Sequence, residues 1–189
     1  MLWLRNLLSI LALPTMVTVA MPLWLSARYG LHWQPPADAS AGALVAAGVL
    51  LLLPGLSLFV ACVTLFWQRG RGTLAPWDPP TVFVASGPYT RVRHPMISGV
   101  FLILVAEACL LRAWPLAAWA AAFAVINATY IPLVEEPALV ARFGDSYRTY
   151  ARTVPRFLPF PTGLARTTGR TGLTPAARRS PPRNPTEGP

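Results

Sequence analysis

Four long apolar segments constrain the fold of this chain more than any other feature. They span residues 7–25, 41–67, 97–111 and 113–134. Of all residues, 54% are hydrophobic and only 12% are charged. A helix that crosses a bilayer needs about 20 predominantly apolar residues. The sequence therefore predicts an all-α membrane protein with about four transmembrane helices, in which the short third segment forms a hairpin with the fourth, turning at Arg112.

The basic residues indicate how these segments are oriented. All 16 are arginines; they cluster in the loop 68–96 and after residue 141, whereas only Arg28 and Arg112 mark the other side. The positive-inside rule places the loop and both termini in the cytoplasm, so the predicted location is integral to an inner or plasma membrane. The net charge of +9 then indicates contact with anionic lipid, and no nucleic acid is expected as a partner.

The composition changes near residue 163. Residues 1–162 form the predicted membrane domain, and residues 163–189, rich in Pro, Arg, Thr and Gly, are predicted to be a disordered cytoplasmic tail. Before the tail, a new helix is expected to begin at Glu136 and Pro137 and to stop at Pro155. It is predicted to be amphipathic and to lie on the cytoplasmic surface. Its apolar face comprises Leu139, Val140, Phe143, Tyr147 and Tyr150.

Polar residues that could do chemistry gather at two ends of the apolar segments. His94 precedes Pro95, a favourable first residue of a helix, so unpaired amide groups at the start of the third segment should face the loop that carries Arg91 and Arg93. A carboxylate would find positive charge there. The pair 135–136, both glutamates, closes the fourth segment on the same side and could hold an ammonium group or ribose hydroxyls.

Each of these features also has a purely structural interpretation. His94 could anchor a membrane helix, and the glutamates could form a solvated helix end paired with arginine. Adjacent helical residues point about 100° apart, so one glutamate is expected to face a ligand while the other, Glu136, pairs with arginine. Glu107, inside the third segment, is a further candidate, unless it lies near the far interface. Both cysteines fall in apolar segments, so neither a disulfide nor a metal site is predicted.

Three stretches together resemble the integral-membrane methyltransferases, a family that includes isoprenylcysteine carboxyl methyltransferase and phospholipid methyltransferases. They are GRGTLAPWDPP at 70–80, GPYTRVRHPMISG at 87–99, and EE at 135–136 with FGDSY at 143–147 and VPR at 154–156. The resemblance covers roughly residues 70–160 and rests on the order and spacing of these stretches. It implies a helical enzyme that takes S-adenosylmethionine from the cytoplasmic side and methylates a lipid or lipidated acceptor.

The resemblance also implies which residues would form the site. Tyr89, His94, Pro95 and Glu135 fall on cofactor-contacting positions, and the stretch Thr81, Val82, Phe83 and Val84 would line the same pocket. The chemistry of the charged residues adds Arg93 and Glu136 to the cofactor-binding set. The candidate acceptor-binding residues are Arg91, Ile97 and Gly99. No catalytic base and no metal ion are predicted.

Two departures from the family pattern bear on the acceptor. Ile97 stands where the family usually has an aromatic residue, and the stretch 130–132 lacks the arginine that the prenylcysteine branch places before its carboxylate pair. Arg91 or Arg93 could replace that arginine. The acceptor and the methylated atom thus stay open, and a non-catalytic membrane scaffold or lipid-binding protein with the same fold is the alternative function.

Overall fold

The structure is a computed structural model that describes residues 13–69 and 86–157. All of these residues belong to one compact unit, Met1–Pro159. Three predictions fall outside the described residues: the tail at 163–189, the pocket-lining stretch at 81–84 and the first motif at 70–80. The described part of the chain is built from helices and loops, which confirms the all-α class.

The first two helices run through the first two apolar segments. The π-helix η1 (Met16–Ala20) continues directly into α2 (Met21–Tyr29), which ends at Gly30. The long helix α3 (Ala39–Arg69) begins after Asp38, whose carboxylate accepts hydrogen bonds from the Ser40 hydroxyl and the Ala41 amide. These hydrogen bonds satisfy part of the helix N-terminus and lower the pKa of Asp38 below its usual range.

The next two helices form the predicted hairpin. A short 3-10 helix, η2 (Gly87–Thr90), leads to α4 (Pro95–Leu111), in which Pro95 occupies the first turn as expected. Arg112 takes a left-handed conformation with φ of 50° and caps α4, and α5 (Trp114–Tyr130) starts two residues later. The predicted turn at Arg112 is therefore confirmed.

The prediction that the fourth apolar helix ends at Glu135 and Glu136 is wrong, although α6 does begin at Glu136 as expected. A π-helical turn, η3 (Ile131–Glu135), joins α5 to α6 (Glu136–Phe143) without interruption. The wider π-helical turn accommodates the chain where Pro132 and Pro137 lack an amide hydrogen. The helix ends instead at Gly144, whose φ of 57° and ψ of −131° are open only to glycine.

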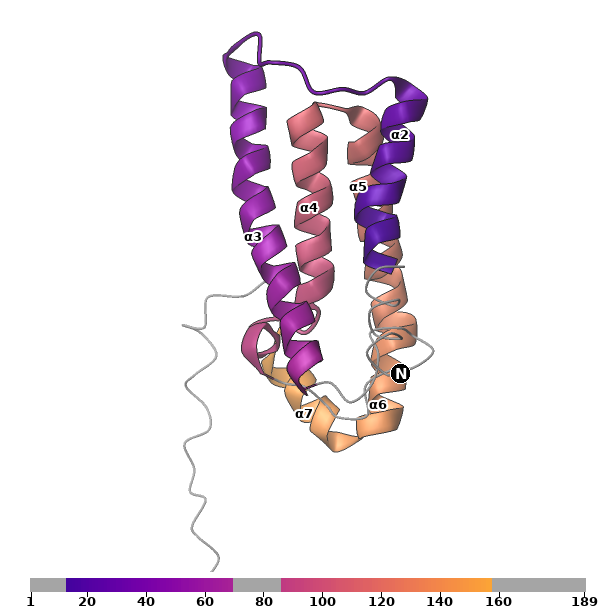
Figure 1. Ribbon diagram of the computed structural model, residues 1–189. Coiled ribbons are helices and arrows are strands. Elements are labelled where there is room, and N and C mark those ends of the chain that lie inside the picture. Colours follow the sequence, from indigo (N-terminus) through magenta and orange to yellow (C-terminus); the bar gives the residue numbers. More distant parts are fainter. Residues whose placement is uncertain (1–12, 70–85, 158–189) are drawn as a thin grey trace, which may run out of the picture. The chain divides into compact units, whose positions relative to one another are not determined.

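The prediction of one amphipathic helix from Pro137 to Pro155 is therefore also wrong, because Gly144 divides it. The second part is α7 (Asp145–Thr153), which buries Tyr147 and exposes Arg148. The five residues expected on the apolar face of a single helix therefore belong to two helices: Leu139, Val140 and Phe143 to α6, and Tyr147 and Tyr150 to α7. Figure 1 shows α6 and α7 following the lower end of α5.

Helix α4 is the centre of the packing. It lies against α3 on one side and α5 on the other (Figure 1). Gly99 and Gly55 let the backbones of α4 and α3 approach closely, since a Cβ on Gly99 would stand 3.1 Å from the Gly55 carbonyl oxygen. Toward α5, buried side chains of Val100, Leu104 and Ala120 form the core.

The outer surfaces of the helices suit an apolar environment. Two helices, Ala39–Leu65 and Trp114–Phe143, are long and apolar enough to cross a membrane, and Pro95–Leu111 is a shorter apolar helix. Their outward faces expose Leu50, Val125 and Leu133. Large apolar side chains exposed along the outward faces of helices are typical of surfaces that face lipid or a partner protein.

Candidate functional site

A cluster of ion pairs joins three segments that are far apart in the sequence. Glu136, in the first turn of α6, accepts a hydrogen bond from Arg93 Nη1 at 2.7 Å, and Arg93 directly precedes His94 and α4. Arg156, beyond α7, donates to the same carboxylate through Nε at 2.9 Å and Nη2 at 2.7 Å. The Glu136 and Arg93 side chains are each only 13% exposed, so the pair is largely shielded from water. The hydrogen bond with Glu136 raises the pKa of Arg156.

The chain after α7 runs alongside the start of α4. The Arg93 amide donates to the Pro155 carbonyl at 2.8 Å, and the His94 amide donates to the Arg156 carbonyl at 3.1 Å. One turn into α4, the Ser98 hydroxyl donates to the Phe157 carbonyl at 3.2 Å. We call residues 154–157 the C-terminal strap. It fixes the backbone on both sides of His94.

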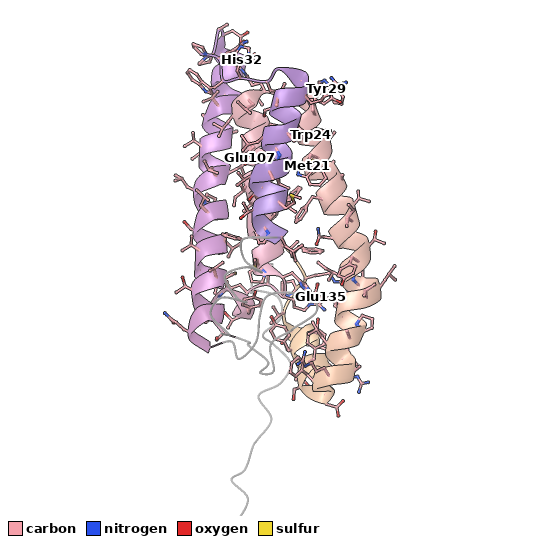
Figure 2. The ribbon with its side chains drawn as sticks, turned by 45° about the vertical axis from the view of Figure 1, so that its right-hand side comes forward. Met21, Trp24, Tyr29, His32, Glu107 and Glu135 are labelled. Atoms are coloured by element: carbon pink, nitrogen blue, oxygen red, sulfur yellow. The ribbon has the colours of Figure 1, made fainter. Side chains whose placement is uncertain are left out.

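His94 lies between the two glutamates. Its ring is 6% exposed, with Nδ1 at 3.5 Å from Glu135 Oε1 and Nε2 at 3.7 Å from Glu136 Oε1. Nε2 is buried and makes no hydrogen bond within the described part of the chain. Glu135 is 39% exposed, three times as much as Glu136. The expectation that Glu136 pairs with arginine is thus confirmed, and Glu135 is the accessible carboxylate (Figure 2).

Tyr89 reaches the same neighbourhood from η2. Its carbonyl accepts a hydrogen bond of 2.7 Å from the Tyr150 hydroxyl of α7, and its own hydroxyl is hydrogen-bonded to Cys62 of α3. Burial raises the pKa of the Tyr89 hydroxyl above its usual range, and the charge of Glu135 acts in the same direction. Tyr89 therefore ties α3 and α7 to the loop that carries His94.

The local sequence explains how the two glutamates come to face His94. Pro95 fixes the start of α4, so His94 becomes the residue before its first turn. Pro132 lies in the π-helical turn that ends at Glu135, and such turns rotate the following side chains relative to a regular helix. The π-helical turn η3 thus determines that Glu136 faces arginine and that Glu135 stays accessible.

Other predicted site residues are placed differently. Arg91 is exposed beside η2, Ile97 is half-buried in the first turn of α4, and Pro95 is buried. Gly99 faces the backbone of α3 at Gly55, so its lack of a side chain serves helix packing. The stretch 81–84 lies outside the described residues.

The sequence interpretation missed two contributors to this cluster. Arg156 was part of the VPR motif but had no assigned role, and it makes the bidentate contact with Glu136. Tyr150 was assigned to a membrane-facing surface, yet its hydroxyl holds the Tyr89 carbonyl. A polar tip on an otherwise apolar face is the only signal in the sequence that could have indicated this contact.

Two further observations concern acidic and metal-binding groups. Glu107 lies in the last turn of α4, far along the helix from His94, and its Oε2 is buried with no hydrogen-bond partner within residues 13–69 and 86–157. In the same ranges, no three His, Cys, Asp or Glu side chains are placed to hold a metal ion.

Comparison with known proteins adds no family: no protein-family model matches the sequence, and no curated protein matches it.

Proposed function

We propose that the chain is a membrane methyltransferase that uses S-adenosylmethionine to methylate a lipid or lipidated acceptor. The observation that carries this proposal is the arrangement around His94. A buried ring with an unpaired nitrogen lies beside an accessible carboxylate, Glu135, while its neighbour Glu136 is already neutralised by two arginines. The accessible carboxylate of Glu135 and the ring of His94, next to apolar helices, suit a cofactor that carries an ammonium group and a carboxylate.

The residues present fit the groups of that cofactor. Glu135 would accept hydrogen bonds from the ammonium group or the ribose hydroxyls. His94 would donate one from Nε2, which makes no hydrogen bond in the described residues and lies 3.7 Å from Glu136 Oε1. When bound, the cofactor supplies an electrophilic methyl group. The chain contributes by positioning and by excluding water, and we assign no catalytic base.

The acceptor side of the proposal follows from the apolar helices. We propose four transmembrane spans with both termini in the cytoplasm, so that an acceptor dissolved in the bilayer can reach the His94 end directly. Arg91 is exposed and close in sequence to His94, which suits contact with an anionic acceptor group. To test the orientation, single cysteines at Ser40 and Arg148 would be labelled with an impermeant maleimide in a background without Cys62 and Cys109. Labelling of both from one side would contradict the four-span arrangement.

Binding of S-adenosylhomocysteine tests the function directly, because this product shares the amino-acid and ribose groups. Calorimetric titration of the detergent-purified chain should show saturable binding. Glu135→Gln and His94→Ala should each weaken it by about ten- to a hundredfold, the loss expected for one charge-assisted hydrogen bond. Asp145→Asn, at an exposed ion pair on α7, is the matched control and should leave binding unchanged.

A non-catalytic scaffold is the second candidate function, and one observation favours it. The ion pairs of Glu136 with Arg93 and Arg156 are complete without any ligand and already hold the C-terminal strap on α4. If the unmodified chain does not bind S-adenosylhomocysteine, or if both substitutions leave its affinity unchanged, the methyltransferase proposal fails and the scaffold takes its place.

A further inference from the structure

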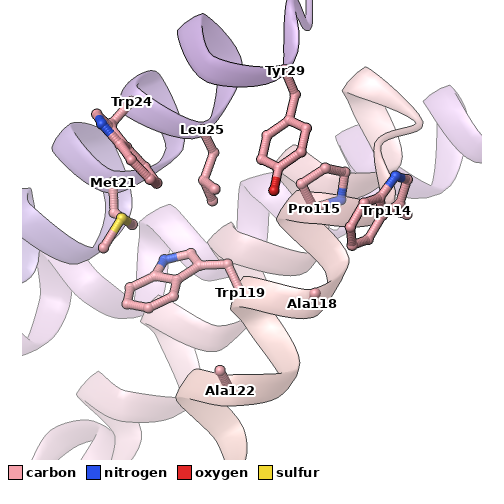
Figure 3. A pocket seen from close by; sticks show the side chains of 9 residues that line it. All are labelled: Met21, Trp24, Leu25, Tyr29, Trp114, Pro115, Ala118, Trp119 and Ala122. Atoms are coloured by element: carbon pink, nitrogen blue, oxygen red, sulfur yellow. The ribbon is translucent and has the colours of Figure 1, made fainter.

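An apolar groove lies between α2 and α5 (Figure 3). It lies toward the end of α4 opposite His94, because its residues Trp114 and Pro115 directly follow the turn at Arg112. Its volume is about 290 Å³, close to the lower limit of about 300 Å³ for small-molecule sites. That size suits part of a hydrocarbon chain better than a whole cofactor. The lining is Met21, Trp24, Leu25 and Tyr29 from α2, with Trp114, Pro115, Ala118, Trp119 and Ala122 from α5.

The groove opens outward from the helices. Its floor on α5 is formed by Ala118 and Ala122, one turn apart and both exposed, so that no long side chain fills the space. The Trp119 indole is fixed because its Nε1 donates to the Val17 carbonyl at 3.0 Å. Trp24 is 59% exposed although it lines the groove. These large apolar surfaces would meet water if nothing covered them.

The rim at the outer end is aromatic and positively charged. Tyr29 and Trp114 contact each other edge to face, with ring centroids 5.8 Å apart, and the Arg28 guanidinium stands 5.8 Å from the Tyr29 ring. Within the described residues, no carboxylate forms an ion pair with Arg28, since Asp38 binds Ser40 and Ala41 instead. Aromatic rings and arginine together mark the level of lipid headgroups on membrane helices.

We propose that this groove is a binding site for an anionic glycerophospholipid. One acyl chain lies in the groove between α2 and α5, and the phosphate group contacts Arg28 at the rim. The charge of Arg28 and the open apolar floor select this occupant, since a neutral chain would leave Arg28 without a counter-charge. The inference concerns the leaflet opposite the His94 end and does not depend on methyl transfer.

The test measures lipid binding to the full chain in detergent. After removal of co-purified lipid, the protein is titrated with phosphatidylglycerol and with phosphatidylcholine of the same chain length, and bound lipid is counted by native mass spectrometry. Phosphatidylglycerol should bind about fivefold more tightly, because one arginine near an anionic headgroup contributes about that factor. Equal affinity for the two lipids would overturn the proposal.

Two substitutions separate the contributions of headgroup and chain. Arg28→Gln should abolish the preference for phosphatidylglycerol, with Arg148→Gln at the other end as control. Ala118→Phe should weaken both lipids by more than about tenfold, since each methylene displaced from the groove contributes about fourfold. Its control is Ala128→Phe, which adds the same bulk at an exposed position of α5 outside the groove.

Two further measurements test whether the groove holds an acyl chain. Thermal unfolding of Ala118→Phe without lipid should match that of the unmodified chain, because the new ring enters open space. Glycerophosphoglycerol, which lacks the chains, should not compete for binding. Competition by this headgroup alone, or unchanged lipid affinity in Ala118→Phe, would show that the groove does not hold an acyl chain.

Discussion

The two ends of α4 are stabilised in opposite ways. At its start, charged side chains from three segments meet in the ion pairs of Glu136 with Arg93 and Arg156, largely shielded from water. At its other end, aromatic rings of α2 and α5 meet across an open groove, and Tyr29 and Trp114 contact each other only at the rim. Figure 2 shows Glu135 at the first end and Tyr29 at the second.

The two ends should therefore tolerate substitutions to different degrees. Ion pairs in a poorly hydrated place are costly to break singly, because the remaining charge keeps no counter-charge. The aromatic side chains at the groove end are instead stabilised by any apolar surface that covers them, so the loss of one contact there can be replaced by another. The His94 end should therefore be sensitive to single substitutions, and the groove end should be tolerant.

The largest effect is expected at Glu136. Glu136→Gln removes the charge that neutralises Arg93 and Arg156, and leaves two cations close to His94. Loss of one partner from a largely buried ion pair costs about 3 kcal/mol of unfolding free energy. Denaturation in detergent, followed by circular dichroism, measures this loss.

Asp145→Asn is the control for the loss of a carboxylate as such. Asp145 pairs with Arg148 on the surface of α7, where the two side chains are 92% and 58% exposed. Exposed pairs contribute about 0–1 kcal/mol. Equal losses for Glu136→Gln and Asp145→Asn would mean that water reaches the first cluster as easily as the second, and the proposed difference between the ends would disappear.

A glycine at each end of the α3–α4 pair gives the second prediction. Gly99→Ala at the His94 end would place a Cβ 3.1 Å from the Gly55 carbonyl oxygen and 3.2 Å from the Phe59 amide, so it should cost about 2 kcal/mol through overpacking. Gly42→Ala, near the start of α3 at the other end, meets no atom within 4 Å and should stabilise its helix by up to about 1 kcal/mol. The same denaturation experiment reports both variants, and a loss in Gly42→Ala as large as in Gly99→Ala would show that the cost of Gly99→Ala does not come from its close contact with α3.

The sequence predicts much of this fold because most helix boundaries are local. Pro95 begins a helix, the hairpin turns at Arg112, and the second and third apolar runs match α3 and α4 within two residues at each end. Adjacent helical residues point in different directions, so the sequence also predicts that only one of the two glutamates stays accessible. These features depend on residues close together in the chain.

What the sequence does not predict depends on helix geometry and on distant partners. The single π-helical turn before Glu136 carries the helix through Pro137, although a proline after a polar pair usually indicates a break. The arginines that pair with Glu136 are Arg93 and Arg156, which are 43 and 20 residues away. Hydrophobic periodicity does not indicate contacts between residues so far apart in the chain. The partners of Glu136 are determined by the packing of the C-terminal strap on α4.

The third prediction concerns a neutral contact at the His94 end. Tyr150→Phe removes the hydroxyl that donates to the Tyr89 carbonyl at 2.7 Å, and a net loss of about 1 kcal/mol is expected for one hydrogen bond. Tyr130→Phe is the control, because Tyr130 is exposed on α5. If the two variants unfold alike, the strap and the ion pairs hold α7 in place without this hydrogen bond.

The last prediction concerns an alkaline pH dependence of the same tyrosine. Burial first, and the neighbouring Tyr147 second, raise the pKa of Tyr150 from its ordinary value of 10 to about 12. A group whose pKa is higher in the folded state stabilises the fold fully below its unfolded pKa and loses that contribution as the pH rises. Between about pH 10 and 12, the unfolding free energy should therefore fall, and it should fall less in Tyr150→Phe, since phenylalanine cannot ionise. Tyr89 and Tyr147 are present in both proteins, so the difference between the two pH profiles reports Tyr150 together with its electrostatic effect on these neighbours. Parallel profiles would show that the Tyr150 hydroxyl is as well hydrated in the folded chain as in the unfolded one, and that the His94 end owes its sensitivity to its ion pairs alone.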